Sequence, residues 1–166
     1  MRIWMVLLAV VLILSGCTTR QYYETMSDCF SEPEKSKAGE VSLLLPVSAE
    51  VVKAEHETNG KLWLCEDYWV CLQTMDSGDV EKTVQEVTGY SLQQLSMICV
   101  DNDGQKRYEF VWCSAGENGQ QMNRGVILDD GAYHYTLTLH SDADSAGDLI
   151  DQWQNITATF AVNTVP

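Results

Sequence analysis

Basic residues are scarce in this chain. Ten lysines and arginines face 24 aspartates and glutamates among 166 residues, and the formal net charge is −14. Such an excess of negative charge repels phosphate backbones and anionic lipid headgroups, so it argues against direct binding to nucleic acid. The acidic residues are spread along the chain, and five tryptophans and seven tyrosines argue against wholesale disorder. The charge is better explained by the solubility of a folded domain.

Histidine is also rare, which limits metal and acid–base chemistry. Only His56, His134 and His140 are present. His134 and His140 share one face of a predicted strand, but at about 3.3 Å per residue they lie roughly 20 Å apart. They cannot share a zinc ion, whose ligands lie within about 2.3 Å of the metal. Each histidine is expected to be a surface residue or a sheet residue with satisfied hydrogen bonds, and no metal or cofactor is predicted.

Nucleophile and phosphate-binding motifs are missing as well. Ser114-Ala115-Gly116 lacks the first glycine of a G-x-S-x-G elbow and precedes a predicted strand, where the elbow requires a helix. Neither a GK[ST] phosphate loop nor a CxxC pair occurs. Any two of the 24 acidic residues could converge as a glycosidase pair, but nothing singles out a pair. No catalytic residue is predicted.

Two acidic clusters invite a cation-binding interpretation. Asp101, Asn102 and Asp103 lack the twelve-residue spacing and closing glutamate of a calcium loop, so a hairpin turn explains them better. The second cluster surrounds a predicted helix start, where free N–H groups and the helix dipole favour anions. Its members are Asp142, Asp144 and Asp148. Capping is the simpler interpretation of this cluster, and weak calcium binding is the alternative.

Tryptophan offers a further route to ligand binding. Side chains of this type can line a sugar or ligand groove, although at core positions of strands and helices they more often serve packing. The residues in question are Trp63, Trp69, Trp112 and Trp153. We expect them to belong to the core.

No apolar run is long enough to cross a membrane stably. The run from Ile3 to Leu14 follows Arg2 and falls short of the about 20 residues that a span requires. It ends at Leu14-Ser15-Gly16-Cys17, and a small-residue cleavage site after a short apolar region is typical of a secretory signal. A cysteine directly after Leu-Ser-Gly resembles the lipobox of bacterial lipoproteins. A plain secretory signal or an uncleaved anchor is the alternative.

The lipobox resemblance implies a division of the chain into three segments. Residues 1–16 form a lipoprotein signal peptide, and Cys17 carries the lipid. Residues 17–40 form a polar, flexible tether, whose root-mean-square reach is roughly 25 Å if it is disordered. Residues 41–166 form the folded domain. Two or three acyl chains would hold the protein on the membrane, because one chain alone binds reversibly.

With Cys17 assigned to lipid, five cysteines are left, and an odd number cannot all pair. They are Cys29, Cys65, Cys71, Cys99 and Cys113. The last four sit among apolar residues and are expected to be small buried hydrophobic residues, with at least one disulfide as the alternative in an oxidising compartment. Cys29 lies in a polar stretch and is expected to be an exposed thiol.

The remaining sequence alternates short strand-like runs with turn signals. Predicted strands cover Val41 to Leu45, Glu50 to Glu57, Leu62 to Cys65, Tyr68 to Met75, Ser96 to Val100, Lys106 to Cys113, Met122 to Leu128 and Ala132 to His140. Predicted turns are Asn59-Gly60, Glu66-Asp67, Asn102-Asp103-Gly104, a loop at Ala115 to Gly119, and Asp129-Asp130-Gly131. In the last strand Tyr133, Tyr135, Leu137 and Leu139 are expected to face the core and His134, Thr136, Thr138 and His140 to be wet or lightly covered.

Two helices are predicted by their apolar spacing. Val80 to Thr88 carries valines on one face, with Asp79 as its N-cap and Gly89 as its C-cap. A second helix follows the S-x-x-D pattern of Ser145 and Asp148 and runs from about Ala146 to Asn155. The apolar residues Ala158 to Val162 either extend this helix or add an edge strand. Consecutive strands with only two helices indicate an α+β fold, an antiparallel sheet with helices packed on it.

The order of these elements resembles the PsbP-like fold over residues 41–162. The likeness rests on the Leu45-Pro46 strand end, the meander and helix, the Asp130-Gly131-x-Tyr133 turn into Tyr135-Thr136-Leu137-Thr138, and the final Ile156-x-x-x-Phe160. The resemblance implies a three-layer α/β/α sandwich used mainly for binding, with no shared catalytic residues. In photosystem members the domain docks on a membrane complex, and in Mog-type members it binds a GTPase. No binding residue of either can be mapped onto this chain.

Together these observations predict a lipid-anchored binding module on the extracytoplasmic face of the cell membrane. Its expected partners are the membrane, through the anchor, and a protein or envelope component. We expect no enzymatic activity. The alternatives are an extracytoplasmic hydrolase, which needs a histidine near an acid and a serine or cysteine, and a small-ligand or cation carrier, which needs a concave pocket.

Overall fold

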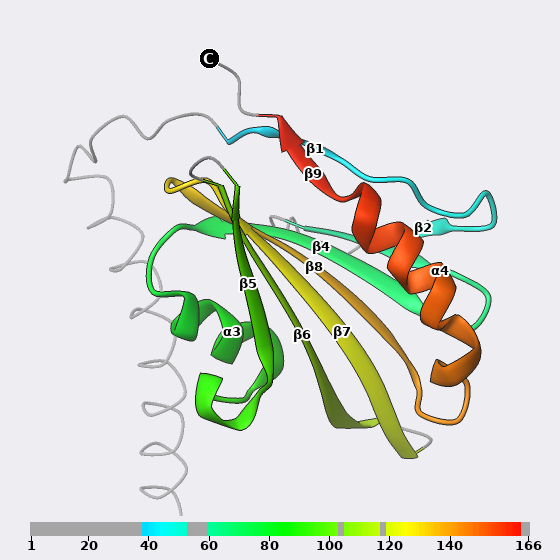
Figure 1. Ribbon diagram of the computed structural model, residues 1–166. Helices are drawn as coiled ribbons and strands as arrows, with labels where there is room; N and C mark the ends of the chain where they lie inside the picture. Colours follow the sequence, from blue (N-terminus) through cyan, green and yellow to red (C-terminus); the bar gives the residue numbers. More distant parts are fainter. Residues whose placement is uncertain (1–37, 53–59, 103–104, 117–118, 164–166) are drawn as a thin grey trace, which may run out of the picture. The chain divides into compact units, whose positions relative to one another are not determined.

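The computed structural model describes residues 38–52, 60–102, 105–116 and 119–163 (Figure 1). The predicted signal peptide, the predicted lipidation site Cys17, most of the predicted tether and Cys29 lie outside the described residues. So do His56, Asp103 and the Asn59 side of the predicted Asn59-Gly60 turn. Within the described residues, no helix is long and apolar enough to cross a membrane.

A seven-stranded antiparallel sheet forms the body of the domain, in the order β2-β3-β4-β8-β7-β6-β5. Its strands are β2 (Glu50–Val52), β3 (Gly60–Leu64), β4 (Trp69–Asp76), β5 (Met97–Asn102), β6 (Gln105–Gly116), β7 (Gly119–Asp129) and β8 (Tyr133–Asp142). The short strands β1 (Glu40–Ser42) and β9 (Ala161–Asn163) pair separately. The α+β class and the antiparallel meander predicted from the sequence are confirmed.

The first helix, α3 (Val80–Thr88), has the predicted bounds. Asp79 is extended, and its carboxylate accepts a hydrogen bond from the Glu81 backbone N–H at 3.0 Å. Gly89 has φ of +78°, the left-handed conformation that glycine adopts without strain, and its N–H closes the last turn on Gln85. A short 3-10 helix, η1 (Leu92–Gln94), then leads into β5.

The second helix, α4 (Ala146–Thr159), starts where predicted but runs beyond Asn155. Ser145 stands at its N-cap but makes no side-chain capping bond, so the capping role given to it was wrong. After α4 the chain turns into β9, so the apolar residues from Ala158 onward both extend the helix and add a strand. β9 pairs antiparallel with β1, which brings the two ends of the described chain together (Figure 1).

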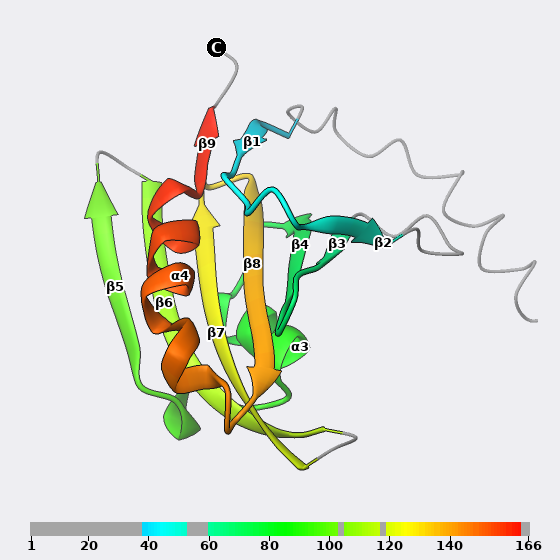
Figure 2. The ribbon, with the colours of Figure 1, turned by 90° about the vertical axis from the view of Figure 1, so that its right-hand side faces the viewer.

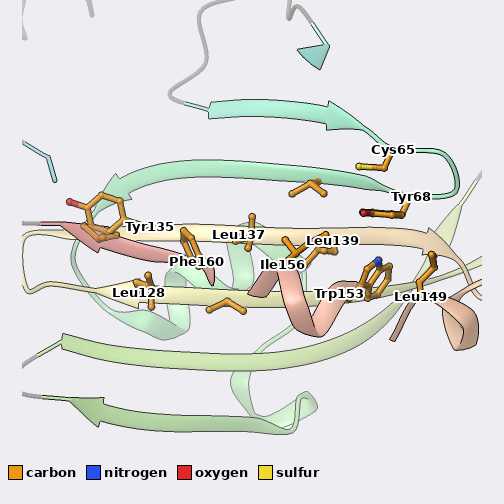
Figure 3. Packing of buried hydrophobic residues seen from close by; sticks show 13 residues of the cluster. Cys65, Tyr68, Leu128, Tyr135, Leu137, Leu139, Leu149, Trp153, Ile156 and Phe160 are labelled. Atoms are coloured by element: carbon orange, nitrogen blue, oxygen red, sulfur yellow. The ribbon is translucent and has the colours of Figure 1, made fainter. Parts of the chain in front are cut away.

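The helices pack on opposite faces of the sheet, and the alternation along β7 shows this directly. Val126 and Leu128 lie in the core beneath α4, whereas Ile127 between them lies in the core beneath α3. Figure 2 shows α4 in front of the strands and α3 behind them. In the α4 core, Trp153, Ile156 and Phe160 lie over Leu137 and Leu139 of β8 (Figure 3).

The opposite core forms between α3 and β6. It contains Tyr108, Phe110 and Trp112 of β6 with Val84 of α3, as their shared strand face predicted. Gly125 of β7 lies beside Phe110, and an added Cβ there would stand 2.5 Å from the ring. Glycine is required because the ring occupies the space that a side chain would need.

Two sequence expectations fail in this sheet. The predicted loop at Ala115 to Gly119 is wrong at its ends, because β6 and β7 stay paired up to Gly116 and Gly119. The second face of β8, which was expected to be exposed or lightly covered, is largely buried. His134, Thr136 and Thr138 are buried, and His140 is half-buried. At His134 the reason is tertiary, since Thr83 of α3 packs against the ring.

The cysteines also depart from expectation. Cys65 is buried and Cys71 is half-buried, but Cys99 and Cys113 are exposed, so the prediction that all four are buried is wrong for the last two. Cys99 lies on the edge strand β5, where apolar neighbours do not imply burial. None of these four described cysteines forms a disulfide.

Arg107 of β6 closes the C-terminal end of α4. Its guanidinium donates to the Thr157 carbonyl at 2.7 Å and to the Phe160 carbonyl at 3.3 Å. Its Nε also donates to Glu109 at 2.7 Å, and Glu109 accepts a second bond from Arg124. Burial alone would raise the pKa of Glu109, but these two guanidinium groups lower it. A cation at this end also complements the helix dipole.

Gly125→Ala should lower the free energy of unfolding by about 1–3 kcal/mol, because the new methyl group forces Phe110 out of its position. Urea denaturation of the two proteins measures the difference. The matched control is Gly147→Ala in the first turn of α4, where nothing lies within 4 Å of the added Cβ. That variant should be unchanged or up to about 1 kcal/mol more stable. Equal effects of the two substitutions would contradict the packing role of Gly125.

Arg107→Met should destabilise the domain by about 1–3 kcal/mol, because it removes the charged donor of two helix-terminal carbonyls and one of the two guanidinium groups on Glu109. Thermal or urea unfolding measures the loss. Lys106→Met, at the exposed neighbouring position, is the control and should stay within about 0.5 kcal/mol of the parent. A stable Arg107→Met protein would show that the α4 end needs no partner from β6.

Candidate binding site

A cavity of about 780 Å³ opens at one end of the sheet. Three connections meet there: the turn between β3 and β4, the ends of β6 and β7, and the passage from β8 into α4. The turn residues Glu66 and Asp67 are exposed, and the Cys65 N–H bonds the Tyr68 carbonyl across them at 2.8 Å. This confirms the tight turn that the sequence predicted at this position.

Beside the cavity, four side chains form a row across four strands. Cross-strand pairing places Trp69 opposite His140, His140 opposite Asn123, and Asn123 opposite Trp112. Because directly paired residues point to the same face, the four side chains are neighbours on the α3 side of the sheet. The His140 ring lies edge-on to both tryptophans, with centroid distances of 6.1 Å to Trp69 and 5.8 Å to Trp112.

Hydrogen bonds fix the His140 ring. Its Nδ1 lies 2.7 Å from Asn123 Oδ1 and its Nε2 lies 2.8 Å from Thr138 Oγ1. Asn123 Nδ2 donates to Trp112 O and Ser114 Oγ, so Asn123 Oδ1 must be an acceptor toward the histidine. We therefore assign the proton of the neutral ring to Nδ1, with Nε2 accepting from the Thr138 hydroxyl. Burial lowers the pKa of His140 to about 4, which keeps the ring neutral at physiological pH.

The lining of the cavity is acidic. Glu66, Asp67 and Asp142 contribute carboxylates, and no lysine or arginine belongs to the lining that the structure describes. Trp69 forms an apolar wall and is 41% exposed. The expectation that all four tryptophans belong to the core is thus wrong for Trp69, whereas Trp112 and Trp153 are buried.

A smaller apolar hollow adjoins the cavity. It has a volume of about 200 Å³ and is lined by Leu62, Trp69, Cys71 and His140. Trp69 and His140 thus border both spaces. Burial raises the pKa of the Cys71 thiol, so this cysteine is the protonated, weakly nucleophilic form at neutral pH.

The other described histidine lies among residue types that hydrolases use, but it is inaccessible. His134 Nδ1 lies 2.7 Å from Thr83 Oγ1, and its Nε2 lies 3.6 Å from Asp129 Oδ2. Both Thr83 and His134 are buried, and His134 has no exposed surface at all. A substrate cannot reach the hydroxyl, so this arrangement ties α3 to β8 instead of forming an active site. The expectation of a surface residue or fully satisfied sheet residue is also wrong here, because His134 Nε2 has no hydrogen-bond partner.

The described members of the predicted acidic clusters do not come together as a metal site. Among the described residues, no group of three or more histidine, cysteine, aspartate or glutamate side chains has the arrangement to hold a metal ion. Asp101 lies in the β5–β6 hairpin, opposite Lys106, and Asp142 lies at the end of β8, where it borders the cavity. Ser114 lies within β6 and accepts a hydrogen bond from Asn123.

Stability should fall as the pH drops from about 6.5 to 4, because His140 stays neutral in the fold while the unfolded chain takes up a proton. The folded pKa lies below the unfolded one, so the stabilisation is fully present above pH 6.5 and about 2–3 kcal/mol of it is lost by pH 4.5. Urea denaturation at pH 7 and pH 4.5 should show a smaller acid loss for His140→Gln than for the parent. Equal losses would mean that His140 is freely protonated in the fold.

Comparison with known proteins gives a fold but no closely related sequence. No family profile and no curated protein matches the chain. Among solved structures, the chain is similar to the solution structure of cyanobacterial PsbP (CyanoP) from Synechocystis sp. PCC 6803, with 14% identity and a TM-score of 0.56 over 81% of this chain and 98% of that one. It is also similar to LpqN, described as involved in cell envelope biogenesis of Mycobacterium tuberculosis, with 11% identity and a TM-score of 0.45 over 80% and 87% of the two chains. The likeness to CyanoP confirms that this domain has the PsbP-like fold.

Proposed function

We propose that this protein is a lipid-anchored, extracytoplasmic binding module that holds a protein or envelope component and carries out no reaction. The observation that carries this proposal is the cavity at the end of the sheet, where the exposed Trp69 and three carboxylates border a space of about 780 Å³. An exposed aromatic wall beside charged groups is a common feature of recognition sites.

The side chains that face the cavity support binding over hydrolysis. His140 is the one histidine in its described lining, and both of its ring nitrogens are already engaged. Its low pKa also leaves it a poor general base near neutral pH. An acid, a histidine and a hydroxyl do come together at Asp129, His134 and Thr83, but His134 and Thr83 are buried between β8 and α3.

A lipid anchor would hold the binding domain at the membrane surface, where it could meet its partner. In this proposal residues 1–16 are removed, Cys17 is acylated, residues 17–40 form the tether, and residues 41–166 form the domain. Gly39 already contacts the fold, since its N–H donates to Tyr135 Oη at 2.8 Å. With α4 and α3 on either side of the sheet, the domain would be the three-layer α/β/α sandwich that the PsbP-like resemblance implies.

A small-ligand carrier is the second candidate function. The volume of the cavity favours it, because sites for small molecules typically measure about 300–1,000 Å³. The two functions differ in whether a second macromolecule is retained.

Crosslinking in native membranes, followed by isolation of the full-length protein, should recover one repeatable macromolecular partner. Trp69→Ala should reduce its recovery several-fold, because the substitution removes the exposed wall of the cavity. Cys17→Ala should release the protein from the membrane fraction, and intact-mass spectrometry should show acyl chains on the parent only.

Two results would contradict this proposal. Unmodified, uncut N-termini in cells would exclude the anchor. Turnover of an ester or glycan substrate, lost in a cavity variant and accompanied by no recovered partner, would replace the binding module with an enzyme.

A further inference from the structure

The charge distribution around the cavity selects for a cation. Glu66, Asp67 and Asp142 are all exposed carboxylates of its lining, which contains no described lysine or arginine. The formal charge of the whole chain, −14, adds to the local field. An anionic ligand would therefore be repelled, whereas a positively charged group would be attracted and concentrated at this end of the molecule.

Trp69 adds a second feature that suits an organic cation. Its indole is 41% exposed and borders the same space as the carboxylates. The face of an indole attracts ammonium and guanidinium groups, and it does so better than tyrosine or phenylalanine. His140, packed edge-on against this indole, is held neutral and adds no opposing positive charge.

The adjoining hollow indicates which chemical group of the ligand lies next to the cation. Its lining combines Leu62 and Cys71 with the shared side chains Trp69 and His140, and it is almost wholly apolar. A ligand that reaches both spaces needs an apolar group beside its charge. A hydrated metal ion would leave the hollow empty, and no described metal-binding cluster is present.

We propose that this cavity and its apolar hollow form one binding site for an ammonium or guanidinium group flanked by an apolar group. Such a pair occurs where a lysine or arginine lies beside a hydrophobic residue in an exposed segment of a partner protein, and also in free organic amines. The proposal names the ligand chemistry of the binding module proposed above, and therefore rests on that function.

The test is a titration of the full-length chain in detergent micelles with Ac-Arg-Leu-NH₂, followed by NMR of the tryptophan indole N–H signals. The Trp69 signal, assigned from its absence in Trp69→Leu, should shift in a saturable manner. Ac-Cit-Leu-NH₂, in which neutral citrulline replaces arginine at nearly equal shape, should bind at least about fivefold more weakly, since it forms no ion pair and no cation–π contact.

Variants separate the two contributions to binding. Trp69→Leu keeps an apolar wall but loses the indole face, and should weaken the peptide about two- to fivefold. Isothermal titration calorimetry compares this variant with the parent, because the variant lacks the Trp69 signal. The triple variant Glu66→Gln, Asp67→Asn and Asp142→Asn should weaken peptide binding about tenfold. All three carboxylates are replaced together because each exposed ion pair contributes little alone. Asp151→Asn, an exposed carboxylate on α4 outside the cavity lining, is the charge-matched control and should bind like the parent.

Two further probes distinguish the source of the cation. If N-acetyl-arginine amide binds more weakly than Ac-Arg-Leu-NH₂, the apolar group contributes, and a protein segment is the ligand. If phenethylamine, a single ammonium group beside an apolar ring, binds more tightly than the peptide, a free organic amine is the ligand. The proposal is overturned if no cationic probe shifts the Trp69 signal, if the citrulline peptide binds equally well, or if the triple carboxylate variant binds like Asp151→Asn.

The outcome is distinguishable from a failure of the binding function itself. A membrane partner that is recovered by crosslinking but is not displaced by Ac-Arg-Leu-NH₂ would leave the module function standing and remove the cation site. Binding of cationic probes without any recovered partner would leave the cation site standing and remove the macromolecule-binding function.

Discussion

The register of β8 against its two neighbours is the constraint on which the rest of this structure depends. β8 pairs with β4 on one side and β7 on the other, and its alternate residues belong to different faces of the sheet. A slip of one residue would move Leu137 from the core beneath α4 to the opposite face. The same slip would separate His140 from Trp69 and Asn123, so one set of backbone hydrogen bonds positions both the core and the cavity wall.

Sequence reasoning succeeded where the relevant interactions are local. Asp79 and Gly89 delimit α3 as predicted because a cap depends on backbone groups within one turn of the helix. The aromatic face of β6 and the apolar face of β8 were also predictable, since strand alternation places those side chains together. The fold class and the PsbP-like resemblance followed from the order of such elements.

The candidate site was largely hidden from the sequence because it is assembled by pairing between distant strands. Trp69, His140, Asn123 and Trp112 come from four different strands and become neighbours only through the sheet register. The pairing of Arg107 with the end of α4 joins residues 50 positions apart and leaves no local pattern. Exposure of Cys99 and burial of His134 likewise depend on which strands are edges and which face α3 covers.

The attachment of Gly39 has a mechanical meaning. The chain enters the fold through one hydrogen bond to the Tyr135 hydroxyl and the three paired positions of β1 and β9. That hydroxyl also donates to Asp130 at the β7–β8 turn. A pull exerted from the N-terminal side meets these few bonds before it reaches the long ladders of the sheet. Under such a pull, the Gly39 hydrogen bond and the β1–β9 pairing would break first, and the seven-stranded sheet would stay paired.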